Sequence, residues 1–187
     1  MNIQIIVGST RPTRVGKQVA EWVEQTVPSH PEFTYEIVDL QKINLPMFNE
    51  PQHPSTGEYT HAHTKAWSEI ISKGDGYIFV TPEYNAGYPA SLKNAIDYLY
   101  HEWTNKPALI ISYGAGGGGT AAHQLHEVLT RLKFNVATQT LNILIPREIL
   151  NDKGQIKDPA ENFKDHAKAL ESAGNELIDL VNTNVAA

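Results

Sequence analysis

Three basic residues gather where a helix is predicted to begin, in the stretch GSTRPTRVGK at residues 8–17. Arg11, Arg14 and Lys17 follow an apolar run, and the stretch contains no acidic residue. The N-terminus of a helix carries partial positive charge, so basic side chains are unfavourable there unless an anion is bound. Guanidinium groups, neighbouring hydroxyls and backbone N–H groups together suit a phosphate dianion. The simpler alternative is that Thr13 caps the helix while the cations are solvated.

A second stretch, TPEYNAGYPA at residues 81–90, joins a predicted buried strand to a helix. Such a loop would direct the backbone N–H groups of residues 83–86 into a cleft. These groups could bind the edge of a flat heteroaromatic ring, with Tyr84 packing beside it. The alternative is a simple turn around Asn85 with surface tyrosines.

A third stretch, SYGAGGGGT at residues 112–120, contains five glycines and could let a ligand or another backbone approach closely. It includes a literal G-x-G-x-x-G at residues 114–119, which is the pattern of dinucleotide-binding folds. We set that interpretation aside because the motif follows the fourth predicted strand and no acidic residue stands about 20 positions later.

Other chemistries find little support in the residue pattern. The pairs His61–His63 and His123–His126 lack a third metal ligand fixed by spacing, so we expect surface histidines. No G-x-S-x-G elbow of a serine hydrolase and no GK[ST] frame of a P-loop is present.

Composition narrows the class of protein further. The chain of 187 residues has 15 basic and 21 acidic residues, a net charge of −6, which argues against binding to nucleic acid or anionic membranes. It contains no cysteine, which excludes disulfides and thiolate chemistry. The N-terminus lacks the features of a signal peptide, so we expect a cytoplasmic protein.

Short apolar runs alternate with amphipathic helical stretches along the whole chain. Predicted strands cover residues 3–7, 33–40, 77–81, 108–113 and 136–145, and the last helical stripe runs from Phe163 to Val181. This alternation predicts one α/β domain over residues 1–187, with a parallel sheet covered on both faces. The three stretches would then meet at the carboxyl edge of the sheet, where such folds bind ligands. Residues 42–61 form a long loop of unassigned role.

The segments GSTRPTRVGKQVAEWV, TPEYNAGYPASLKNAIDYLYHEW and KPALIISYGAGGGG resemble the NADPH-dependent FMN reductase family, a flavodoxin-fold group that includes azoreductases, quinone reductases and chromate reductases. The likeness runs from the first strand to about Leu132. It implies a flavodoxin-like three-layer sandwich with a five-stranded parallel sheet of order 2-1-3-4-5. It also implies bound FMN, NADPH or NADH as the hydride donor, and a homodimer or tetramer.

The resemblance also implies which residues bind the cofactor. Those for the FMN phosphate are Ser9, Arg11, Arg14, Val15, Gly16 and Lys17. Those beside the isoalloxazine ring are Pro82, Glu83, Tyr84 and Asn85, with Ser112, Gly114 and Gly116 at its pyrimidine side. Many family members carry Ser where Arg14 stands, so the role of Arg14 is a departure from the family pattern.

Flavin N5 carries the hydride in this family, so the resemblance implies no catalytic acid or base. We expect the amides of the glycine stretch, with the dipole of a helix beginning near Thr120, to stabilise negative charge on the reduced ring. The helix from Pro89 to His101 is expected to form the dimer interface, with Tyr88 and Trp103 beside the partner's flavin.

The function expected from the resemblance is transfer of two electrons from NADPH through FMN to quinones, azo compounds, free flavin or similar acceptors by a ping-pong mechanism. An alternative is a flavodoxin-type electron carrier without reductase activity. The local positive charge of residues 8–17 argues against a carrier, because carriers tend to hold the phosphate with hydroxyls and backbone alone. A flavin-free Rossmann dehydrogenase is the third alternative.

Replacing Arg11 with alanine should therefore weaken FMN retention far more than it perturbs the apoprotein, because the arginine serves the anion and not the fold. Dialysis of the FMN-loaded variant, with thermal unfolding of its apo form, measures both effects. A variant that keeps its flavin through dialysis would contradict the phosphate interpretation.

Overall fold

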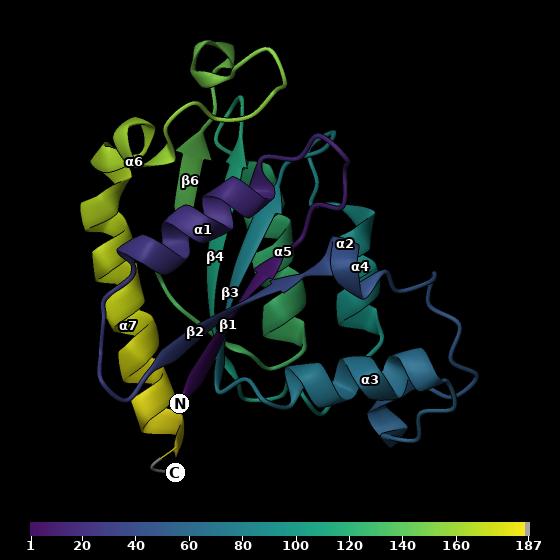
Figure 1. Cartoon of the computed structure of the whole chain (residues 1–187). Coiled ribbons are helices and arrows are strands. Elements are labelled where there is room, and N and C mark those ends of the chain that lie inside the picture. Colours follow the sequence, from purple (N-terminus) through teal and green to yellow (C-terminus); the bar gives the residue numbers. More distant parts are fainter. Residues whose placement is uncertain (186–187) are drawn as a thin grey trace.

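Six strands form one parallel sheet in the computed structural model, which describes residues 1–185 (Figure 1). They are β1 (Asn2–Val7), β2 (Thr34–Asp39), β3 (Gly76–Pro82), β4 (Pro107–Gly114), β5 (Asn135–Val136) and β6 (Leu141–Leu144). The order is β2-β1-β3-β4-β5, with β5 beside the start of β4 and β6 beside its end. The predicted α/β class and strand order are confirmed.

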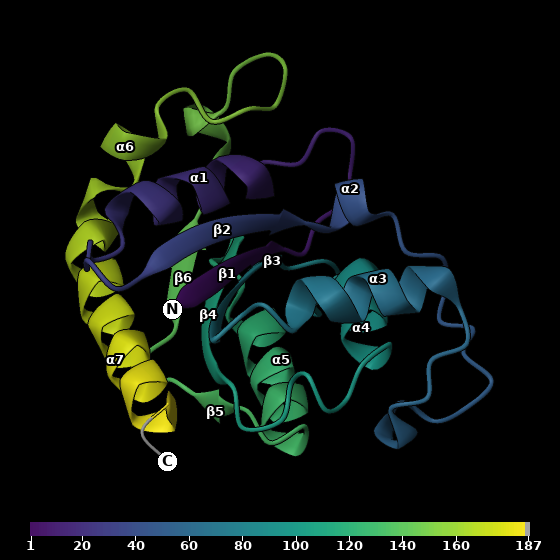
Figure 2. The same cartoon turned by 60° about the horizontal axis from the view of Figure 1, so that its bottom comes forward.

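Helices cover both faces of this sheet, as Figures 1 and 2 show. One layer contains α1 (Gly16–Thr26), α6 (Pro159–Asn162) and α7 (Ala167–Val185). The other contains α3 (Ala62–Ile71), α4 (Ala90–Asp97) and α5 (Gly119–Arg131), with the short α2 (Leu40–Ile43) directly after β2. Single 3-10 turns lie at Pro54–Thr56, Arg147–Ile149 and Lys164–His166.

The central strands are apolar throughout because both of their faces are buried. In β3, Ile78 and Val80 belong to the core beneath α1 and α7, whereas Tyr77 and Phe79 belong to the core beneath α3, α4 and α5. Side chains alternate between the faces of a strand, so a run of consecutive apolar residues fills two cores at once.

The predicted strand over residues 136–145 is interrupted, which corrects that expectation. Between β5 and β6, the backbone N–H and hydroxyl of Thr138 donate to Glu176 Oε1 at 2.7 and 2.8 Å, and the Gln139 N–H donates to Oε2 at 3.3 Å. Burial alone would raise the pKa of Glu176, but these hydrogen bonds lower it. The chain leaves the sheet here because a carboxylate from α7 satisfies its backbone.

The predicted final stripe from Phe163 to Val181 is also divided. Asp158 caps α6 by accepting from the Glu161 N–H at 3.1 Å, and α7 begins only at Ala167. Phe163 packs its ring 5.2 Å from that of Trp22, so it contributes to the core from outside the long helix.

The long loop at residues 44–61 is fastened to α4 and to the start of α3. The Phe48 N–H donates to Asn94 Oδ1 at 2.8 Å, and Asn94 Nδ2 donates to the Pro46 carbonyl at 2.7 Å. Glu50 accepts from the N–H groups of Thr60 and His61 at 2.8 and 2.9 Å, immediately before α3. Polar contacts of this kind hold the loop in one place, and a 3-10 turn at Pro54–Thr56 is its regular element.

Trp103 corrects the expected dimer interface. Its side chain is fully buried, and its indole N–H donates to the Ile96 carbonyl at 3.1 Å. Its ring centroid lies 5.2 Å from that of Tyr77 and 5.6 Å from that of Phe134. Trp103 is therefore part of the core and cannot lie beside a partner's flavin.

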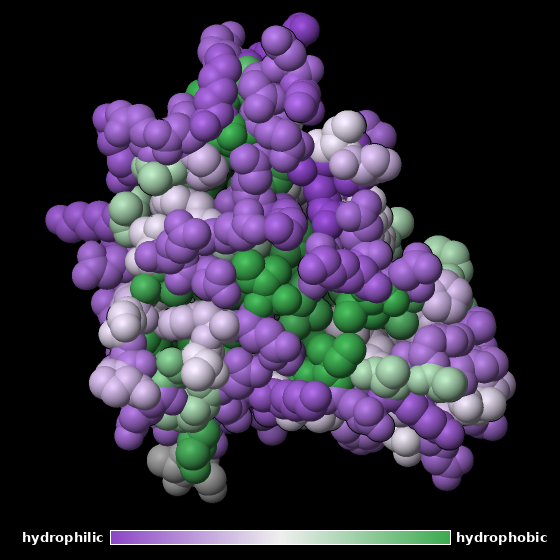
Figure 3. Space-filling view, viewed as in Figure 1, coloured by the Kyte–Doolittle hydropathy of each residue, from purple (hydrophilic) through white to green (hydrophobic). Residues whose placement is uncertain are grey.

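The surface drawn in Figure 3 is mainly hydrophilic, and apolar side chains gather between β2 and α3. The exposed large hydrophobic residues include Met47, which is 75% exposed, and its neighbour Phe48. Within residues 1–185, no helix has the length and apolar character needed to span a membrane.

Glu50 should make the stability of the fold depend on pH. Burial alone would raise the pKa of Glu50, but the N–H groups of Thr60 and His61, with the Thr64 hydroxyl and His61 charge nearby, lower it from 4.5 to about 2. A lowered pKa means that the carboxylate stabilises the fold above its unfolded pKa and that this contribution is lost as pH falls towards the folded pKa. Glu50→Gln should therefore be destabilising at neutral pH, and its difference from the natural protein should shrink below about pH 4.5.

Urea unfolding followed by tryptophan fluorescence across this pH range measures the difference. Glu58→Gln, an exposed change in the same loop, is the matched control. A Glu50→Gln difference that stays constant down to about pH 2 would show that the charge of Glu50 is not its source.

Candidate functional site

The three stretches singled out in the sequence lie together at the carboxyl edge of the sheet. The hydroxyls of Ser9 and Tyr84 are 2.6 Å apart, which joins the first loop to the second. The Glu83 carboxylate accepts from the Thr120 N–H at 3.0 Å, which joins the second loop to the start of α5. The predicted meeting of these loops is confirmed.

The first turn of α1 has backbone donors that no side chain caps. Val15 is the N-cap residue and makes no side-chain capping hydrogen bond, and Gly16 is the first helical residue. The alternative in which Thr13 caps the helix is therefore wrong. The Arg11 guanidinium lies above the Tyr84 ring, 5.7 Å from its centroid, at the mouth of the same loop. The N-terminus of α1 therefore combines uncapped backbone N–H groups with the positive charge of Arg11 nearby.

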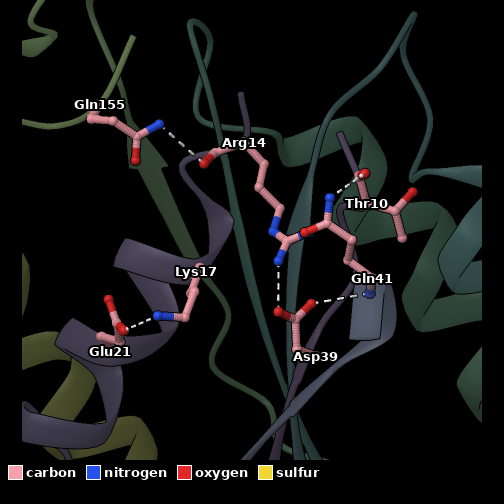
Figure 4. A network of polar contacts seen from close by, with 7 residues as sticks. All are labelled: Thr10, Arg14, Lys17, Glu21, Asp39, Gln41 and Gln155. Atoms are coloured by element: carbon pink, nitrogen blue, oxygen red, sulfur yellow. Dashed lines mark hydrogen bonds and ion pairs between the residues drawn. The ribbon is translucent and has the colours of Figure 1, made fainter. Parts of the chain in front are cut away.

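The three predicted cations differ in their surroundings, as Figure 4 shows for two of them. Arg14 Nη2 donates to Asp39 Oδ2 at 2.6 Å in a buried pair. Lys17 Nζ donates to Glu21 Oε1 at 2.5 Å on the exposed side of α1. Arg11 has no carboxylate partner among residues 1–185. The expected cluster of three free cations is therefore reduced to one, with Arg14 partly neutralised.

Asp39 connects this pair to the end of β2. Its second oxygen accepts from the Gln41 N–H at 3.0 Å, and Gln41 Nε2 donates to the Thr10 carbonyl at 3.3 Å (Figure 4). The network ties the first loop to the residues at the end of β2. It was invisible in the sequence because Asp39 lies 25 positions after Arg14.

The second loop closes on itself in a tight turn. The Tyr84 N–H donates to the Gly87 carbonyl at 2.8 Å, and the Gly87 N–H donates to the Tyr84 carbonyl at 3.1 Å. Asn85 and Ala86 have φ values of 49° and 62°, in the left-handed region. An alanine in that region is strained, a feature that clusters at functional sites.

This turn changes which donors face the cleft. The Glu83 N–H donates to the Tyr113 carbonyl at 3.1 Å, so Glu83 and Tyr84 have no free backbone donor. The exposed N–H groups of Asn85 and Ala86 have no acceptor in the described part of the chain. The predicted set of four backbone donors is thus corrected to two. Pro82 ends β3 and lies buried beneath the turn.

In the glycine loop at residues 114–119, the backbone at the centre of the loop lies close to the side chain of Ser112. Gly117 and Gly118 have φ values near +83° and +82°. A Cβ on Gly118 would lie 2.9 Å from that of Ser112, so only glycine fits there. Gly114 ends β4, and Gly116 is exposed with open space around it.

Glu83 occupies donors that were expected to serve a reduced ring. Besides the Thr120 N–H, its Oε2 accepts from the Ala121 N–H at 3.2 Å. The N-terminus of α5 is therefore already neutralised by a carboxylate from another loop. The exposed N–H groups of Ala115 and Gly116 remain without an acceptor among the described residues.

Two predicted binding hydroxyls already have protein partners. Ser112 Oγ lies 2.6 Å from Asn142 Oδ1 and 2.9 Å from the Gly117 carbonyl oxygen, in a fully buried position. Ser9 is equally buried and is engaged with Tyr84. Ser112 therefore supports the glycine loop from beneath, and Ser9 positions Tyr84.

Tyr113 is a site residue that sequence reasoning missed. It extends from β4 towards α1, is 4% exposed, and its hydroxyl has no hydrogen-bond partner among the described residues. Burial, then the neighbouring Tyr84, raises its pKa, and the nearby Ser9 hydroxyl and the charges of Arg14 and Arg11 oppose this rise. Ser9 is close enough to influence the Tyr113 hydroxyl, but its own hydrogen bond is to Tyr84. The signal was present in the sequence, since Tyr113 alternates with Ser112 along the strand and so faces the layer that contains α1.

A cavity of about 260 Å³ lies between the first loop and Tyr113. The residues around it are Arg11, Thr13, Arg14, Val15, Pro82, Tyr84, Tyr113, Ile145, Leu150 and Gly154. Its far wall belongs to the segment 146–158, which the side chain of Gln18 ties to α1. Gln18 Nε2 donates to the Ile156 carbonyl at 3.0 Å and Gln18 Oε1 accepts from the Ile156 N–H at 2.9 Å.

Comparison of the sequence with known proteins identifies a family with which the chain shares most of its length. A model of the NADPH-dependent FMN reductase family matches residues 1–144. An NAD(P)H-dependent FMN reductase of Schizosaccharomyces pombe is 44% identical over 184 residues, covering 97% of this chain and 91% of that protein. A quinone reductase of Pseudomonas putida is 33% identical over 170 residues, covering 87% of this chain and 88% of that one.

The fold also has solved counterparts. FerB, a flavoenzyme NAD(P)H:(acceptor) oxidoreductase from Paracoccus denitrificans, superimposes with a TM-score of 0.74 at 21% identity, covering 98% of both chains. At this identity the likeness bears on the fold, and it agrees with the flavodoxin-like sandwich expected from the sequence.

Removing the Glu83 carboxylate should loosen the start of α5. Glu83→Ala should lower the free energy of unfolding by about 1 kcal/mol, the usual cost of a lost helix cap. Glu83→Gln should cost less, since its amide oxygen still accepts a hydrogen bond. Urea unfolding measures both, with the exposed Glu127→Ala on the same helix as the control. Equal effects of Glu83→Ala and Glu127→Ala would contradict the capping role.

Proposed function

Because the chain belongs to the NADPH-dependent FMN reductase family and is an NAD(P)H-dependent flavin oxidoreductase, we propose that it holds FMN at the carboxyl edge of its sheet and reduces small acceptors by a ping-pong mechanism. The acceptors we propose are quinones, azo compounds, free flavin or similar molecules. The observation that carries the proposal is the uncapped N-terminus of α1 beside a cavity that Arg11 also lines, an arginine with no carboxylate partner among residues 1–185.

The residues at the α1 end fit the phosphate of FMN. Backbone N–H groups of Val15, Gly16 and Lys17 precede the first intrahelical hydrogen bond and can donate to phosphate oxygens. Arg11 adds a cation without a competing carboxylate in the described residues, and Arg14 adds a second, oriented by Asp39. We assign Lys17 a longer-range electrostatic role, since its ammonium group is paired with Glu21.

The residues of the other two loops fit a flat ring. Tyr84 and Pro82 offer apolar surface, while the N–H groups of Asn85 and Ala86 can donate to the ring edge. Gly114 and Gly116 let the ring approach the backbone, and the Ala115 and Gly116 N–H groups can stabilise negative charge there. When bound, FMN supplies the hydride chemistry. The protein binds and orients the reactants, and we assign no side chain as acid or base.

We further propose a homodimer or tetramer whose interface uses α4 and the loop at residues 44–61. Met47 and Phe48 are exposed apolar residues fastened beside α4 through Asn94, and Tyr88 is half-buried at the start of that helix. A second copy would remove these side chains from water. Trp103 takes no part in this surface because it is buried.

The proposed function predicts a yellow protein whose flavin bleaches within seconds when NADPH or NADH is added without air. Addition of a quinone should restore the colour, and initial rates at several quinone concentrations should give parallel double-reciprocal lines. Absorbance near the flavin maximum measures both. Failure to bind supplied FMN would contradict the proposal, and binding without bleaching by either nucleotide would favour the electron-carrier alternative.

A further inference from the structure

Two buried donors at the cavity between the first loop and Tyr113 have no hydrogen-bond partner among residues 1–185. They are Tyr113 Oη and Arg14 Nη1, and both residues line that cavity. Buried polar groups are normally paired, because an unmade hydrogen bond in the interior is costly. Their shared location indicates that a ligand atom completes them.

We infer that Tyr113 binds the phosphate of the cofactor, donating its hydroxyl hydrogen to a phosphate oxygen alongside Arg14 Nη1. The inference rests on the proposed function and adds a binding residue to which the family resemblance assigned no role. It makes the end of β4, and not only the loop before α1, part of the phosphate site.

The charges around the Tyr113 hydroxyl fit an acceptor that is anionic. Arg11 and Arg14 both favour negative charge near it, and the Asp39 carboxylate is already engaged by Arg14 and Gln41. A buried tyrosine hydroxyl stays protonated at neutral pH and can donate. Phosphate oxygens only accept, so the two groups are complementary.

Gly16 supplies the space that this hydroxyl needs. A Cβ on Gly16 would lie 2.4 Å from Tyr113 Oη and 3.2 Å from its Cζ, closer than real contacts allow. Gly16 does not have a positive φ, so its backbone conformation does not require glycine. The glycine at the first position of α1 is therefore explained by the approach of Tyr113 to the helix N-terminus, where a bound phosphate would also receive the backbone N–H groups.

The inference can be tested by comparing two flavins that differ only in the phosphate. Tyr113 should contribute to binding of FMN, which has a phosphate, and not to binding of riboflavin, which lacks one. Tyr113→Phe removes one hydroxyl and keeps the ring. The matched control is Tyr77→Phe in β3, which removes a buried hydroxyl that donates to the Ile71 carbonyl at 2.7 Å, far from the cavity.

Flavin fluorescence titrations with FMN and with riboflavin, and thermal unfolding of the apoproteins, test this. Tyr113→Phe should raise the Kd for FMN about tenfold to a hundredfold, as for a lost hydrogen bond to a charged group, and leave the Kd for riboflavin unchanged. Its apoprotein should unfold at no lower temperature, because the lost hydroxyl has no hydrogen-bond partner in the described part of the chain. Tyr77→Phe should lower the unfolding temperature and leave both Kd values unchanged.

An unchanged Kd for FMN in Tyr113→Phe, or an equal loss for FMN and riboflavin, would overturn the inference. Inorganic phosphate alone provides a readout independent of flavin, since it should raise the unfolding temperature of the natural protein more than that of Tyr113→Phe. Stabilisation of this kind in a protein that binds neither flavin would keep the anion site and refute the proposed function. Absence of both flavin and phosphate binding would refute the two together.

Gly16→Ala tests the spacing. It should weaken FMN binding in the natural background by displacing the Tyr113 hydroxyl, and it should weaken binding less when combined with Y113F, because the nearest clashing atom is gone. Additive losses in the double variant would show that Gly16 and Tyr113 act independently, which would count against the inference.

Discussion

Unpaired backbone donors at helix N-termini are the constraint around which this molecule is organised. The carboxylate of Glu83 caps α5 from another loop, Glu50 accepts from the backbone just before α3, Asp39 caps α2 and Asp158 caps α6. Each cap also fastens a loop, so the same bonds that complete helices give the carboxyl edge of the sheet its shape. The first turns of α1, α3 and α4 receive no side-chain cap from their N-cap residues, and of these three helices only α1 has an arginine, Arg11, beside its first turn.

That exception explains how stability and binding are divided between residues. Loops with internal partners are held by the protein itself, as Ser112 and Asn142 hold the glycine loop and Ser9 holds Tyr84. At the start of α1, by contrast, the backbone N–H groups of the first turn have no acceptor among the described residues. A protein that leaves donors unpaired in one place accepts lower stability there in return for affinity, which is a common arrangement at binding sites.

The sequence was sufficient for those features that depend on local pattern. Continuous apolar strands such as Gly76–Pro82, alternating with amphipathic helices, predicted a buried parallel sheet with the three loops at its carboxyl edge. The strand order came from the resemblance to a known family. The pair of Lys17 and Glu21 was also within reach of the sequence, since the two residues are four positions apart on a helix.

Features that depend on distant partners could not be predicted in the same way. Three contacts join segments that are far apart in the chain. Arg14 pairs with Asp39, and the Thr138 hydroxyl donates to Glu176. The ring of Trp103 packs against those of Tyr77 and Phe134. Periodicity says which face a side chain occupies, but not which group from another element meets it. Tyr113 is an example of both cases. The sheet face that its side chain occupies could be predicted from the alternation along the strand, but the lack of a hydrogen-bond partner for its hydroxyl could not.

The segment 146–158 forms one wall of the cavity and follows the stretch that the family model matches. The family match ends at residue 144, just before this wall begins, yet Leu150 and Gly154 border the same space as Arg11 and Tyr113. The residues proposed to bind the phosphate and the residues that close the cavity around it therefore lie in different stretches of the sequence. How tightly a ligand is held and how fast it escapes can then change independently, one through the motif and the other through the wall.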